Sequence, residues 1–124
     1  MDEKDALTRA VIGAAIEVHR IMGPGLLESV YQTCLEEEFR IRGIKCDPQF
    51  RVALSYKGIS LSDYLVLDFF FPGELVLEIK AVDKIIPVFE AQLLTYLKLT
   101  NTRVGLLIYF NSPVLKYGLK RMVL

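Results

Sequence analysis

The sequence has no stretch of apolar residues long enough to cross a membrane. Residues 64–72 are interrupted by Asp68, and the run Val104–Phe110 holds only seven residues, whereas a transmembrane helix needs about 20 in succession. The first five residues, Met1–Asp5, carry charges of both signs and lack the apolar region of a signal peptide. We therefore expect no membrane span and no secretory leader.

Cysteine and histidine are scarce. Cys34 and Cys46 are isolated, lack the spacing of a zinc finger, and are too few for a disulfide scaffold at this size. Cys34 falls on the apolar side of a predicted helix, where a reduced core thiol is expected. His19 is the only histidine and has no partner at metal-ligand spacing. These features favour a cytoplasmic protein.

The chain also has no excess of charge of one sign. Its 15 lysines and arginines balance 15 aspartates and glutamates, whereas a protein dedicated to gripping the double helix is usually basic. Catalytic carboxylates would offset basic residues, so the balance is only a weak argument against a nucleic-acid substrate. There is no glycine-rich phosphate cradle and no nucleophile elbow.

The sequence does contain enough apolar material for one core. Of its 124 residues, 52% are hydrophobic and 24% are charged, which fits a single domain over residues 1–124 and not two domains with separate cores. Apolar residues recur at helical spacing over residues 5–22 and again over residues 26–42. Gly23-Pro24-Gly25 separates the two predicted helices, and Gly43 is the natural cap of the second.

After Gly43 the spacing of apolar residues changes from the period of a helix to that of strands. One further helix is predicted among these strands. Pro87 suits the first turn of this helix, which is predicted to run to about Leu99. The first three strands can form a meander, and the third strand, the helix and the fourth strand form a parallel crossover, which is nearly always right-handed. The sequence predicts an α/β sandwich with a mixed sheet in the order ααβββαββ. Strands are predicted at residues 50–56, 64–71, 74–81, 104–110 and 119–124.

Charged residues stand out in two of these strands. Asp68 is the one charge among the apolar and aromatic residues of Tyr64–Phe71, a strand expected to be covered on both faces. An unpaired carboxylate there would cost several kcal/mol or be neutralised. In the next strand Glu78 and Lys80 are two residues apart and point the same way. Taken alone, such a pair would be a solvated ion pair on an outer face, which is common and contributes little.

The neighbours of these charges argue against that interpretation. Val66, Phe70 and Val76 fall on the same face, so the face is not freely solvated. Carboxylate oxygens suit magnesium, and a lysine can position a water and help to deprotonate it. The residues therefore indicate metal-assisted chemistry.

This arrangement resembles the PD-(D/E)XK nuclease superfamily, in which an aspartate precedes a Glu-x-Lys on the next strand. Gly25–Tyr31 matches the signature that names the GxxExxY branch of that superfamily, and Gly118–Arg121 resembles the usual ending of the branch. Residues 91–97 resemble the helix after the active strand, which often carries a glutamine, here Gln92. Leu67 stands where the superfamily often has a proline, which carries no metal.

The resemblance implies a restriction-endonuclease-like sandwich and magnesium-dependent hydrolysis of a nucleic-acid phosphodiester. Manganese is the alternative ion, and DNA is favoured over RNA as the substrate. Asp68 and Glu78 would bind the metal, with the main-chain carbonyl of Ile79 as a further ligand. Lys80 would orient the attacking water.

Two helix residues have implied roles and ordinary alternatives. Glu28 would reach the site from its helix, but an acid in the first turn also suits the helix dipole. Gln92 would steady Lys80 or a phosphate, but it could also cap a loop. Tyr31 and Tyr96 lie on apolar helix faces and are interpreted as core residues.

A rival interpretation is a catalytically inactive nuclease-fold module that acts with a partner protein or nucleic acid. Asp68, Glu78 and Lys80 would then be a structural ion cluster. Retention of three buried charges favours the enzyme, because such charges cost stability unless they serve a purpose. A small-molecule enzyme with an acid pair lacks any cofactor motif. A homodimer is expected, since a symmetric pair would double the surface offered to a duplex.

The hairpin at Pro72-Gly73 decides whether Asp68 and Glu78 can meet. A two-residue loop would place Asp68 opposite Leu77 and turn it away from Glu78, because side chains alternate along a strand. We therefore predict a three-residue loop, Phe71-Pro72-Gly73, or a bulge, with the glycine in the left-handed conformation.

Overall fold

The computed structural model describes residues 3–82 and 84–124, with side chains from residue 6 onward. Five strands form one sheet in the order β1-β2-β3-β4-β5, in which the β3–β4 pair is parallel and the other pairs are antiparallel. In chain order the elements are α1 (Glu3–Met22), α2 (Glu28–Arg42), β1 (Asp47–Tyr56), β2 (Ile59–Phe71), β3 (Leu75–Lys80), α3 (Pro87–Leu99), β4 (Val104–Tyr109), the 3₁₀ helix η1 (Leu115–Gly118) and β5 (Leu119–Val123).

The predicted α/β sandwich with a mixed sheet is confirmed, and so is the predicted order of helices and strands. Several bounds differ. The second helix begins at Glu28, two residues later than Leu26, because Leu27 has an extended backbone and occupies the N-cap. The sequence analysis also missed η1, a short 3₁₀ turn before the last strand. In the described part of the chain, no helix is long and apolar enough to span a membrane.

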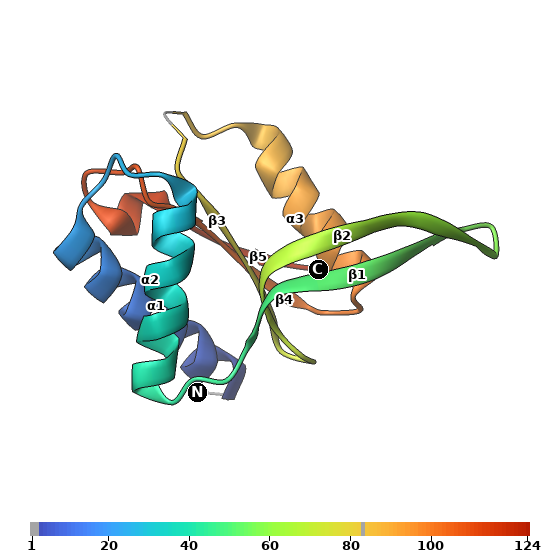
Figure 1. The fold of residues 1–124 in the computed structure, drawn as a ribbon, viewed down its shortest axis with the longest axis horizontal. Helices are drawn as coiled ribbons and strands as arrows, with labels where there is room; N and C mark the ends of the chain where they lie inside the picture. The colour runs from blue at the N-terminus through green and yellow to red at the C-terminus, as the bar shows by residue number, and fades with distance from the viewer. Residues whose placement is uncertain (1–2, 83) are drawn as a thin grey trace.

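The sheet separates two apolar clusters (Figure 1). Helices α1 and α2 cover one face, where Phe39 packs edge-on against Phe69 and Phe71. Helix α3 covers the other face and buries Leu93 and Leu97. Strand β3 is buried on both sides, which explains its nearly continuous apolar sequence.

The β2–β3 turn has three residues, Pro72-Gly73-Glu74, so the predicted residues Phe71-Pro72-Gly73 were wrong by one position. Phe71 pairs with Leu75, and the Glu74 N–H donates to the Phe71 carbonyl at 2.9 Å. Gly73 has a φ of 76°, as predicted. Proline and glycine at the two central positions are typical of a type II turn, which explains the shift. The odd length puts Asp68 level with Glu78, as a shared site requires.

The alternation of β2 breaks at Asp68. Phe69 and Phe71 belong to the cluster under α1 and α2, yet Leu67 belongs to the cluster under α3, although residues two apart normally share a face. On β1, Gln49 lies between the partners of Leu67 and Phe69 and has a φ of 48°, an uncommon conformation for a residue other than glycine. The ribbon therefore twists sharply at this point.

Beyond the twist, β1 and β2 continue as a two-stranded arm. Strand β2 pairs with β3 only from Phe69 to Phe71, whereas it pairs with β1 out to Ile59. Figure 1 shows this arm projecting from the body of the molecule. Both strands are longer than predicted, because the alternating pattern is weak over residues 57–63, where every side chain is exposed.

Close packing of α3 on β4 depends on Gly105. A Cβ atom added at Gly105 would lie 2.9 Å from Leu93 Cγ, inside the buried α3 cluster. Such overpacking typically costs about 1–3 kcal/mol. We therefore expect Gly105→Ala to lower the free energy of unfolding by about 1–3 kcal/mol in urea denaturation.

The matched control is the same change in a Leu93→Ala background. Removing the leucine side chain makes room for the added methyl group, so Gly105→Ala should then cost nothing or stabilise. An equal cost in both backgrounds would contradict the assigned contact.

Candidate active site

Asp68 lies where strands β2 and β3 part. Continuing their register would place Leu67 opposite Ile79, but the ladder ends at Phe69–Leu77. Instead, the Ile79 N–H donates to Asp68 Oδ2 at 2.9 Å. Gln49 Nε2 donates to Asp68 Oδ1 at 3.4 Å, a longer bond. The carboxylate thus satisfies an amide that the sheet leaves free and is held against β3.

Glu78 is buried next to Asp68. Its side chain is 4% exposed, and Oε1 has no hydrogen-bond partner among the described residues. Burial, the hydrogen bond with Asp68 and the negative charge of Asp68 together raise the pKa of Glu78 to about 10, and the opposing effects of Lys80 and the Asp68 backbone are smaller. Without another cation, Glu78 therefore holds a proton at neutral pH.

Lys80 points from the end of β3 toward α3. Its Nζ donates to Gln92 Oε1 at 3.3 Å and lies 4.4 Å from the centroid of the Phe89 ring. Residues 89 and 92 are three apart on the helix and therefore neighbours on its surface. Helix α3 thus fixes the lysine from two sides.

Glu28 is the first residue of α2 and is exposed at the rim of the candidate site. Partial burial and the nearby Asp68 carboxylate raise its pKa, whereas Lys80 and the Ala81 backbone amide lower it. A pocket of about 320 Å³ lies between α2 and β1–β2 and is lined by Glu28, Ser29, Gln32, Thr33, Gln49 and Asp68. Glu28 is thus close enough to interact electrostatically with both Asp68 and Lys80.

The segment before α2 has its own hydrogen bonds. Tyr31 is fully buried and stacks on Phe110, with ring centroids 4.4 Å apart. Its hydroxyl donates to the Gly23 carbonyl at 2.6 Å and accepts from the Leu26 N–H at 3.1 Å. Gly25 has a φ of 91°. Tyr31 is a core residue, as interpreted, and it also fixes the loop that delivers Glu28.

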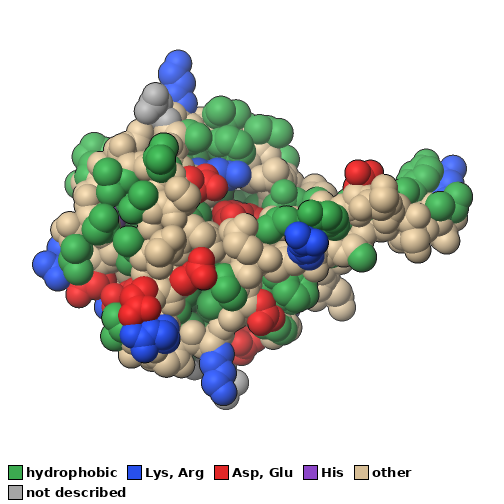
Figure 2. Space-filling model, viewed as in Figure 1, with side chains coloured by type: hydrophobic (Ala, Val, Ile, Leu, Met, Phe, Trp, Pro, Cys, Tyr) green, Lys and Arg blue, Asp and Glu red, His purple; other side chains and the backbone are tan. Residues whose placement is uncertain are grey.

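The structure therefore brings Asp68, Glu78, Lys80, Glu28 and Gln92 to one place. Figure 2 shows acidic and basic side chains in a hollow between the helices and the base of the arm. Of Ile79, also a predicted ligand, the structure shows the N–H bonded to Asp68. Within the described ranges, no group of three or more His, Cys, Asp and Glu residues is arranged to hold a metal ion.

Tyr96 packs against the α3 cluster, as expected of a core residue, and it also lies near the candidate site. It is only partly buried, and burial and the charges of Glu78 and Asp68 raise its pKa, whereas a hydrogen bond with Gln92 lowers it. Its position four residues after Gln92 places it on the same side of α3. That spacing could have identified it from the sequence.

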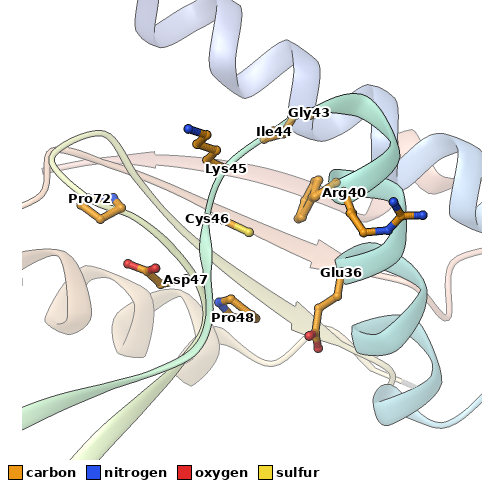
Figure 3. Close-up of a pocket in the computed structure, with 10 residues that line it drawn as sticks. Glu36, Arg40, Gly43, Ile44, Lys45, Cys46, Asp47, Pro48 and Pro72 are labelled. Atoms are coloured by element: carbon orange, nitrogen blue, oxygen red, sulfur yellow. The ribbon is translucent and has the colours of Figure 1, made fainter.

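A larger pocket, of about 740 Å³, lies elsewhere (Figure 3). It opens between the end of α2, the start of β1 and the β2–β3 turn, and it contains none of the predicted site residues. Cys46 lines it as a free thiol, and burial raises the pKa of that thiol to about 11. A protonated thiol is a poor nucleophile, so we place the chemistry at the carboxylates and not in the larger pocket.

The raised pKa of Glu78 predicts how the free energy of unfolding depends on pH. The folded protein binds one more proton than the unfolded chain between pH 4.5, the ordinary value, and about pH 10. Its free energy of unfolding therefore falls as pH rises through this window, by up to about 1.4 kcal/mol per pH unit. Glu78→Gln removes this titration, so its stability relative to the parent should increase from pH 5 to pH 9 in urea titrations with EDTA.

Glu74→Gln is the matched control, because Glu74 is exposed in the adjacent turn. Its stability relative to the parent should stay flat over the same range. A flat difference for Glu78→Gln as well would show that Glu78 is not held as an acid.

Comparison with known proteins agrees with this geometry. A family model described as the PD-(D/E)XK nuclease superfamily matches residues 5–122. Neither the curated proteins nor the solved structures contain a match to the chain. The family match spans almost the whole sequence and includes every residue of the candidate site. The chain belongs to the PD-(D/E)XK nuclease superfamily.

Proposed function

We propose that the chain is a single-domain, divalent-metal-dependent nuclease of the GxxExxY branch. The observation that carries the proposal is the Glu78 carboxyl group, which is buried beside Asp68 and keeps one oxygen without a hydrogen-bond partner among the described residues. Buried polar atoms are rarely left in that state unless an ion, a water or a catalytic role explains them. The reaction would be hydrolysis of a nucleic-acid phosphodiester bond, with DNA as the favoured substrate over RNA.

The types of residue around Glu78 are those that a hard divalent cation prefers. Glu28, Asp68 and Glu78 place three carboxyl groups near a single lysine, and carboxylate oxygens are the ligands that Mg²⁺ and Mn²⁺ prefer. Asp68 and Glu78 would hold the ion, with the Ile79 carbonyl as a further donor. When bound, the ion would offset negative charge on the phosphate and favour ionisation of water.

Lys80 would orient the attacking water. One of its three N–H donors is used by Gln92, which leaves others for a water or phosphate oxygen. In hydrolysis the water oxygen forms a bond to phosphorus while the bond from phosphorus to the leaving ester oxygen breaks. Lys80 would hold the water in line for this displacement, Gln92 would position Lys80, and Glu28 would hold further solvent at the rim.

The second candidate is an inactive interaction module with the same fold. It is favoured by the hydrogen bonds of Asp68, which already accepts from the Ile79 amide and from Gln49. In that case the carboxylates and Lys80 would stabilise the parting of β2 and β3 and nothing more. A measurement of metal binding would distinguish the metal-dependent nuclease from the inactive module.

We expect the three central residues to respond differently to substitution. Asp68→Asn or Glu78→Gln should weaken the binding of Mg²⁺ and abolish cleavage, because each removes an anionic oxygen. Lys80→Ala should leave metal affinity equal or higher, because it removes a nearby positive charge. Its turnover should fall about a hundredfold or more, the scale of a positioned proton-transfer group. Calorimetric titration with Mg²⁺ and Mn²⁺, beside cleavage assays on DNA and RNA, tests both effects.

Loss of metal binding in Lys80→Ala with retention in the carboxylate variants would reverse the assigned roles. If the parent bound neither ion in the presence of nucleic acid, the inactive module would be the better description. Thermal unfolding of each variant shows whether the fold is kept.

We also propose a homodimer in the cytoplasm. The free thiols of Cys34 and Cys46 support a reducing compartment. A symmetric dimer would double the surface offered to a nucleic-acid substrate. Light scattering after gel filtration should give the mass of two chains at micromolar concentration, and a mass of one chain would contradict the dimer.

A further inference from the structure

The arm presents one side that the nuclease site does not explain. Phe50, Val52 and Leu67 pack with the α3 cluster, so the residues between them face the opposite side, the side of α2. Arg51 and Val66 form one cross-strand pair there, and Tyr64 follows two residues further out. Tyr64 is 49% exposed and Val66 is 38% exposed. Exposed apolar side chains grouped on one surface usually mark a binding site.

Arg51 is the basic group of this surface. Its guanidinium carbon lies 4.5 Å from the centroid of the Tyr64 ring. None of the ion pairs formed by the described residues includes Arg51. A guanidinium over an aromatic ring keeps its N–H donors at its edge, where they can bind a phosphate in bidentate fashion. The pair therefore offers both a cation and an aromatic surface.

This surface leads directly from the candidate active site. The pocket beside Asp68 is also lined by Gln49, and Arg51 and Val66 lie two residues further outward on β1 and β2. Tyr64 is four strand residues from Asp68, or about 13 Å. In Figure 2 hydrophobic side chains and a basic one lie at the base of the arm, next to the hollow with acidic side chains.

We propose that this side of the arm binds a single strand of nucleic acid, with Arg51 on a phosphate and Tyr64 stacked on an unpaired base. The inference rests on the proposed nuclease function and names its substrate class. It also explains how a polyanion could approach three carboxyl groups, because Arg51 would hold the strand a short distance from them.

A single strand fits this surface better than a duplex. Aromatic rings stack on bases that are free of their partners, and they do so with every base. Gripping a duplex depends on several lysines and arginines on phosphates, whereas this surface has one arginine beside Val66 and Ala53. Duplex binding is therefore an outcome that the test must be able to detect.

The test measures the binding of short fluorescein-labelled DNA and RNA strands, and of the matching duplex, by fluorescence anisotropy. Glu78→Gln serves as the background, so that the strands stay intact in Mg²⁺. Adding Tyr64→Leu should weaken single-strand binding at least tenfold, because leucine keeps the bulk and loses the ring, whereas Tyr64→Phe should change it less than twofold. Arg51→Ala should weaken binding and lower the salt dependence by about 0.7 in log–log slope, the value for one phosphate of a single strand.

The arm also supplies a matched control at its tip. Lys57 lies over Tyr56, with Nζ 5.4 Å from the ring centroid, and Ile59, the partner of Tyr56, is nine residues from Asp68, or about 30 Å. Replacing Tyr56 and Lys57 by alanine should leave the binding of a short strand within twofold. Equal losses at both places, no loss at either, or preference for the duplex would overturn the inference. Thermal unfolding identifies any variant that fails to fold.

Cleavage assays keep this inference separate from the proposed function. If the parent cleaves nucleic acid but Arg51→Ala and Tyr64→Leu bind strands as the parent does, strand binding by the arm would be refuted and the nuclease function would be supported. If strand binding depends on the arm but no cleavage occurs in Mg²⁺ or Mn²⁺, the nuclease function would be refuted and strand binding by the arm would be supported. No binding by the parent would refute the inference.

Discussion

The hydrogen bond from the Ile79 amide to the Asp68 carboxylate is the interaction on which the site depends. It ends the β2–β3 ladder without leaving a buried amide unpaired, which would cost roughly as much as a lost hydrogen bond. Because the carboxylate replaces a main-chain partner, β2 is free to twist away from β3 opposite Gln49 of β1, and the two strands continue as the arm. The same bond holds Asp68 beside Glu78. The geometry of the site and the start of the arm therefore both depend on the side chain of Asp68.

The second constraint is the charge of the site. Burial and Asp68 keep the Glu78 carboxyl protonated in the absence of a cation, so the folded protein avoids a cluster of buried anions. Lys80 offsets part of the charge and is itself fixed by Gln92 and Phe89. Retaining acidic groups in such a costly place is characteristic of sites that bind an ion or catalyse a reaction.

Local patterns in the sequence were sufficient to predict the helices and strands, and to predict that Asp68, Glu78 and Lys80 lie together. The lone charge of Asp68 in an apolar strand and the alternation of β3 both indicate the same face of the sheet. The turn residues came out one position off, because the preference of Pro72-Gly73 for a type II turn competes with the hairpin pattern. The parting of β2 from β3 depends on contacts between distant segments, which periodicity does not report.

The arm also has a consequence for how the protein opens. Residues 51–66 are held by the β1–β2 ladder and lack β3 pairing, and an isolated two-stranded ribbon is marginally stable in water. The body is held by two apolar clusters. Local opening free energies follow such differences in packing. The arm can therefore fray and re-form, exchanging its amide hydrogens with solvent, while the amide of Ile79 stays protected at the hinge.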